Sequence, residues 1–161
     1  MAFRNVSSQD RSTFAIGMAA CATGLYFGLV GLGLVPEPSR INGPLWLGSL
    51  AGLAIFSAGL AIVVRAFAGM GDSAGEMPPD APRWMKTVYW LCGVIAMASL
   101  AAIGTWVAFG SGERAFSMSG LIDGSIGAGI GRAIFGICSI MTWAMVIAFM
   151  CVGARKIFAK S

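Results

Sequence analysis

Residues 41–64 read INGPLWLGSLAGLAIFSAGLAIVV, and no charged side chain interrupts them between Arg40 and Arg65. A helix needs roughly 20 apolar residues to cross the hydrocarbon core of a bilayer, so this stretch is long enough for one crossing. Three other stretches also lack charge: 12–36, 87–112 and 133–154. The 11 basic and 7 acidic residues all lie outside these four stretches. We therefore predict membrane spans near 14–35, 44–64, 87–109 and 133–153.

The composition of the whole chain agrees with this pattern. Apolar residues make up 57% and charged residues 11%, against about 45–50% and about 25% in soluble domains. In lipid only helices and closed barrels satisfy the backbone, and barrel strands alternate over about 10 residues instead of staying apolar throughout. The sequence therefore predicts one domain, 1–161, that is an all-α integral membrane four-helix bundle.

The basic residues predict how the bundle is oriented. With four spans, the N-terminus, the loop 65–86 and the C-terminus share one side of the membrane. That side carries eight basic residues: Arg4, Arg11, Arg65, Arg83, Lys86, Arg155, Lys156 and Lys160. The other side carries Arg40, Arg114 and Arg132. Because cytoplasmic loops are enriched in Lys and Arg, we expect both termini and the 22-residue loop 65–86 to be cytoplasmic.

The outer loop between the third and fourth spans, 110–132, is slightly longer and partly apolar. Its large apolar residues are Phe116, Met118, Leu121 and Ile122. Such a segment either lies in the membrane interface or forms a contact patch for a partner subunit. The sequence leaves both interpretations open. The loop 65–86 has no net charge, which makes it a poor binder of nucleic acid or of anionic lipid.

Small residues recur at helical spacing on two of the predicted spans. On the first span they are Gly17, Cys21, Gly24, Gly28 and Gly31, and on the second they are Gly48 and Gly52. Steps of three and four keep residues on one helix face, and small residues let helix backbones approach closely in lipid. These faces predict either packing within the bundle or contact with a partner chain, including a second copy of this one.

The residue types needed for most chemistry are missing from the predicted spans. The chain has no histidine, and no ionisable carboxylate or basic side chain lies inside a span, whereas transport pathways usually carry such groups. The four cysteines, Cys21, Cys92, Cys138 and Cys151, read as small buried apolar residues. The hydroxyls of Thr23, Ser57, Ser99, Thr105, Ser139 and Thr142 can bond to their own helix or to a neighbour. We predict no catalytic residue, no metal site and no cofactor.

Two short segments resemble parts of known membrane proteins. Gly43-Pro44-Leu45-Trp46 with residues 47–67 resembles the second helix of the small four-helix subunit of tripartite tricarboxylate transporters. That resemblance covers one span and the turn before it, and it implies a component of a solute transporter. Residues 106–117 are similar to a segment of uncharacterised bacterial membrane proteins, which implies no activity. We expect the chain in a bacterial inner membrane.

The sequence thus favours a non-catalytic accessory or structural subunit of a membrane assembly. Its expected partners are the lipid bilayer and other membrane subunits or a second copy of itself, without nucleic acid. The alternatives are a small transporter component and, less favoured, an enzyme or redox anchor. The pattern identifies neither the partner nor a solute.

Overall fold

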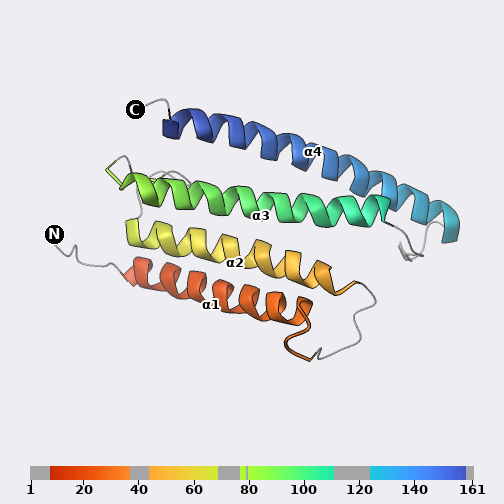
Figure 1. The fold of residues 1–161 in the computed structure, drawn as a ribbon, viewed down its shortest axis with the longest axis horizontal. Coiled ribbons are helices and arrows are strands. Elements are labelled where there is room, and N and C mark those ends of the chain that lie inside the picture. The colour runs from red at the N-terminus through yellow and green to blue at the C-terminus, as the bar shows by residue number, and fades with distance from the viewer. Residues whose placement is uncertain (1–7, 37–43, 69–76, 79, 111–123, 159–161) are drawn as a thin grey trace.

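The computed structural model describes residues 8–36, 44–68, 77–78, 80–110 and 124–158, and they form four long helices (Figure 1). These are α1 (Ser8–Gly31), α2 (Leu45–Ala68), α3 (Arg83–Phe109) and α4 (Gly124–Phe158). Each helix contains an apolar segment long enough to cross a membrane: Arg11–Gly31, Leu45–Ala68, Arg83–Phe109 and Gly129–Arg155. The prediction of an all-helical chain with four apolar helices of spanning length is confirmed.

The helices stack in chain order. Among the described residues, contacts join α1 to α2, α2 to α3 and α3 to α4, and no other pair of helices. Figure 1 shows this order from bottom to top, and it places the start of α1 and the end of α4 at the same end of the molecule. In a closed four-helix bundle every helix has two neighbours. Here the bundle is open, because α1 and α4 each pack on one helix.

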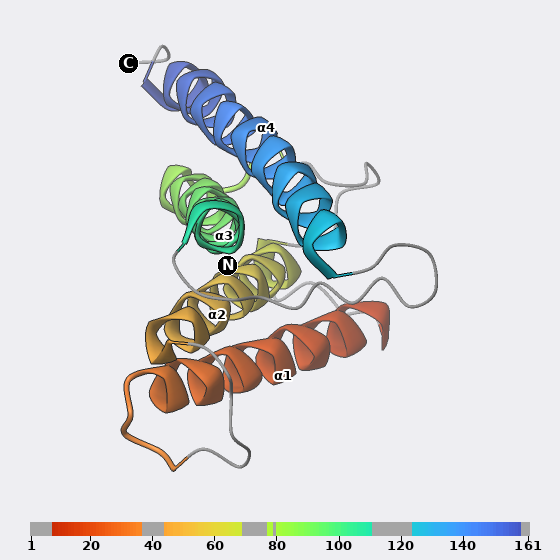
Figure 2. The same ribbon diagram turned by 90° about the vertical axis from the view of Figure 1, so that its right-hand side faces the viewer.

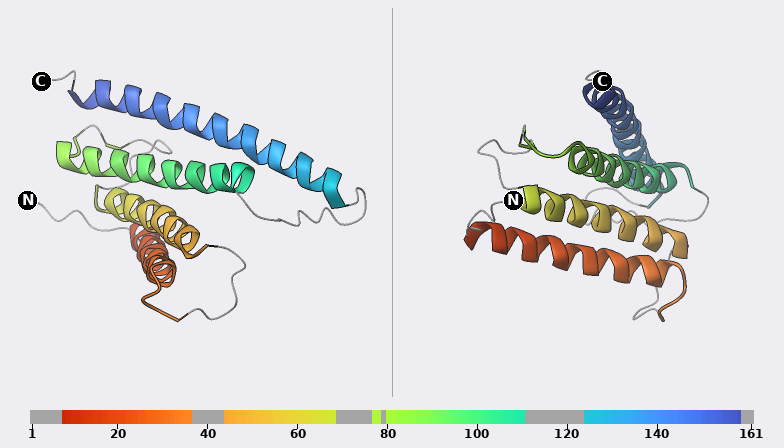
Figure 3. Two further views of the ribbon diagram at one scale, coloured as in Figure 1. Left: turned by 45° about the vertical axis from the view of Figure 1, so that its right-hand side comes forward. Right: turned by 60° about the vertical axis from the view of Figure 1, so that its left-hand side comes forward.

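The two halves of the stack are inclined to each other. Figure 2 looks nearly along α3 while α1 and α2 lie across the view, and the left view of Figure 3 shows α1 and α2 foreshortened while α3 and α4 lie across it. Edge-to-face aromatic contacts join neighbouring helices near their ends. Phe14 meets Phe67 with ring centroids 5.4 Å apart, and Trp46 meets Trp106 at 5.8 Å.

Helix α1 ends earlier than the sequence predicted. The predicted span runs to residue 35, but Gly33 terminates the helix before that point, with a φ of 71°. Leu34 N–H donates to the Leu29 carbonyl at 3.0 Å, and Gly33 N–H donates to the Val30 carbonyl at 2.9 Å. This pair of bonds is a Schellman motif, which satisfies the last free carbonyls of a helix and favours glycine at the left-handed position.

Helix α4 begins earlier than predicted. Residues 124–132, which the sequence analysis placed in the outer loop, belong to this helix. These residues include four glycines, and they extend the helix beyond the predicted span. The outer-loop candidates Phe116, Met118, Leu121 and Ile122 lie outside the described residues.

Candidate functional site

Helices α1 and α2 meet along a seam in which their backbones are in direct contact. A Cβ atom built on Gly24 would lie 2.7 Å from the Gly52 carbonyl oxygen, and one built on Gly52 would lie 2.6 Å from the Gly24 carbonyl oxygen. Real Cβ atoms do not come so close to backbone atoms. The two backbones therefore touch directly, which only residues without a side chain permit.

The contact continues along both helices. A Cβ on Gly31 would lie 2.6 Å from the Ser49 hydroxyl oxygen, and one on Gly17 would lie 2.8 Å from Val63 Cγ2. Gly48 fits more loosely, with Gly31 Cα 3.3 Å from its Cβ position. The Cys21 thiol faces the Phe56 carbonyl oxygen at 3.7 Å. The small-residue faces predicted on α1 and α2 thus lie against each other within one chain.

Two positions in the seam differ from the sequence analysis. Gly59 was not selected, yet its Cβ position is 2.7 Å from the Cys21 backbone nitrogen, so it belongs to the seam. The signal was available, because Gly59 follows Gly52 by about two helical turns. Gly28 was selected, but a Cβ there meets none of the described atoms within 4 Å. Its backbone touches Gly52, while the side-chain direction of Gly28 points into open space.

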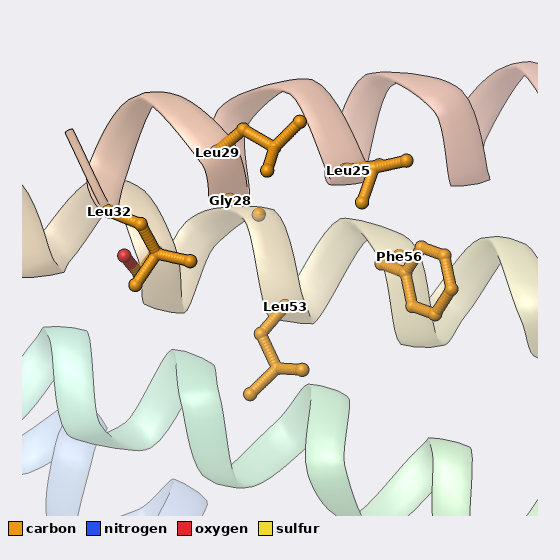
Figure 4. Close-up of a pocket in the computed structure, with 9 residues that line it drawn as sticks. Leu25, Gly28, Leu29, Leu32, Leu53 and Phe56 are labelled. Atoms are coloured by element: carbon orange, nitrogen blue, oxygen red, sulfur yellow. The ribbon is translucent and has the colours of Figure 1, made fainter. Parts of the chain in front are cut away.

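That open space is a groove of about 300 Å³ along the edge of the seam, shown in Figure 4. Leu25 and Leu29 of α1 and Leu32, just after its end, form one wall, and Leu53 and Phe56 of α2 form the other. Gly28 lies between the two walls.

Side-chain hydrogen bonds join helices α3 and α4. The hydroxyl oxygens of Thr105 and Ser139 are 2.7 Å apart, and the Ser139 hydroxyl also lies 3.0 Å from the Ala101 carbonyl oxygen. Trp143 Nε1 donates to Thr105 Oγ1 at 3.1 Å. Ser139 is only 4% exposed. These groups form a polar cluster that satisfies buried hydroxyls and fixes the register of the two helices.

The sequence analysis allowed the hydroxyls to bond either within or between helices, and both occur. Thr23, Ser57 and Thr142 bond to the carbonyl four residues earlier in their own helices, at 2.9, 2.6 and 2.7 Å. Thr105 and Ser139 also bond across helices. The spacing of hydroxyls along one helix does not reveal which of them faces a neighbour, so the sequence left this choice open.

Replacing Ser139 with alanine should destabilise the α3–α4 contact modestly. Interhelical hydrogen bonds in membranes contribute about 0.6 kcal/mol on average and up to roughly 1.7 kcal/mol, because the unfolded state in lipid finds partners too. We expect a loss in that range for Ser139→Ala in denaturant unfolding in detergent. Thr142→Ala is the matched control, since the Thr142 hydroxyl bonds within its own helix. Equal losses for both variants would contradict a cross-helix role for Ser139.

A second contact, centred on Trp90, joins α3 and α4 at their other ends. Trp90 Nε1 donates to the Phe149 carbonyl oxygen at 3.2 Å. The indole lies directly over Gly153, so that a Cβ on Gly153 would overlap the Trp90 ring. Neither residue was selected from the sequence, because they lie on different helices at no recognisable spacing.

The four cysteines differ in exposure. Cys92 is buried, as the sequence analysis expected, but Cys138 and Cys151 are exposed on α4, which corrects that expectation for these two. Within the described residues no group of three or more His, Cys, Asp or Glu side chains comes together. The features that the structure describes are the glycine seam and groove between α1 and α2 and the hydrogen bonds between α3 and α4.

No family model, curated protein or solved structure matches the chain. The resemblance of residues 43–67 to a transporter subunit therefore stays an expectation from the sequence.

Proposed function

We propose that the chain is a non-catalytic integral membrane subunit that packs against partner subunits within the bilayer. Because the small-residue faces of α1 and α2 are used against each other, we place the partner contact on α4. The observation that supports this is the packing of α4, which contacts α3 and no other described helix and has the smallest buried share of the four spanning segments, 17%.

The uncovered face of α4 is broad and apolar. Ile137, Ile140, Met141 and Met145 are each 60–63% exposed. Methionine side chains are flexible and adapt to irregular surfaces, so a face that mixes Met and Ile suits contact with another membrane helix. Hydrophobicity alone does not drive such contact in lipid, where van der Waals packing does.

A photo-crosslinking amino acid at Met141 tests this proposal in the native membrane. We expect one discrete crosslinked protein of reproducible mass at Met141. The control position is Ile16, which is 63% exposed on α1. Equal and diffuse crosslinking from both positions, with a lone monomer after mild detergent extraction, would contradict a subunit role.

The orientation proposed for this subunit places both termini in the cytoplasm. Figure 1 shows that α1 begins, α2 ends, α3 begins and α4 ends on one side of the molecule. By their positions in the chain, Arg11, Arg65, Arg83, Lys86 and Arg155 belong to these helix ends, whereas Arg132 belongs to the first turns of α4, which begins on the other side. This asymmetry follows the positive-inside rule.

Reporter fusions test the orientation directly. A reporter joined after Ser161 should give the cytoplasmic signal, and one inserted near Gly112 should give the opposite signal. If both fusions give the same signal, the four-span topology is wrong. If the signals are opposite but reversed, the topology stands and the orientation is wrong.

A further inference from the structure

We draw no further inference here: the strongest candidate, the open apolar groove over Gly28 between α1 and α2, carries none because nothing in the structure shows what covers it.

Discussion

Gly24→Leu is expected to separate α1 from α2 and to lower the free energy of unfolding more than Ser139→Ala or Gly153→Ala does. The Cβ position of Gly24 is 2.7 Å from both the Gly52 carbonyl oxygen and Phe56 Cα, so the obstacle is backbone and not a movable side chain. Overpacking typically costs about 1–3 kcal/mol, and we expect the upper end of that range because neither helix can yield locally. Thermal unfolding in detergent, monitored through the reactivity of the cysteine thiols, measures the loss of stability.

Gly28→Leu is the matched control, one helical turn away on the same face. The sequence alone places Gly24 and Gly28 on the same small-residue face and does not distinguish them. The structure separates them, since a Cβ at Gly28 enters the groove. We expect no loss of stability for Gly28→Leu, and leucine also has a helix propensity about 0.8 kcal/mol better than that of glycine. Equal damage from both variants would show that the groove is closed in the folded protein.

The spans were predictable because one physical requirement dominates them. A helix in lipid must satisfy its own backbone and carry roughly 20 apolar residues, so charge-free stretches such as 41–64 mark spans directly. The ends of helices were harder. Residues 124–132 contain several glycines, which argue for a loop in water, yet these residues form a continuous part of α4. Helix propensity is a weak guide that the surroundings override.

Part of the α1–α2 seam was also predictable, because steps of three and four residues place small side chains on one face. What the sequence could not give was the rotation of one face against the other. That rotation decides why Gly24 is pressed against Gly52 while Gly28 opens onto a groove. The same limit applies to α3 and α4, where Trp90 and Gly153 meet although nothing in their spacing pairs them.

The order of helix packing was another feature that the pattern of apolar residues did not determine. In lipid all faces of a span are apolar, so the distribution of apolar side chains around a helix does not distinguish a face that contacts a helix from one that contacts lipid. The exposed thiols of Cys138 and Cys151 on α4 illustrate this, because the sequence analysis assigned them to the interior. The packing order depends instead on which helix faces carry groups that fit together: glycines between α1 and α2, and hydroxyl and indole groups between α3 and α4.

Gly153→Ala is expected to displace the Trp90 indole and to destabilise the α3–α4 contact by about 1–3 kcal/mol. A methyl group at position 153 would overlap the indole ring, so the ring must move and lose its 3.2 Å hydrogen bond to the Phe149 carbonyl oxygen. Because the obstacle is a side chain that can rotate away, we expect a smaller loss than for Gly24→Leu. Gly129→Ala on the same helix is the control, since its Cβ meets open space.

A double-mutant cycle decides whether the loss arises from this one contact. In a Trp90→Ala background the methyl group at position 153 has no ring to displace, so Gly153→Ala should then cost little. The coupling between the two substitutions should fall within about 0.5–3 kcal/mol, as it does for residues in direct contact. If the two losses simply add, the indole does not rest on Gly153. The ends of α3 and α4 near the chain terminus would then be held together by other contacts, such as the close approach of Phe149 to Gly93, whose Cβ position is 3.4 Å from the Phe149 ring.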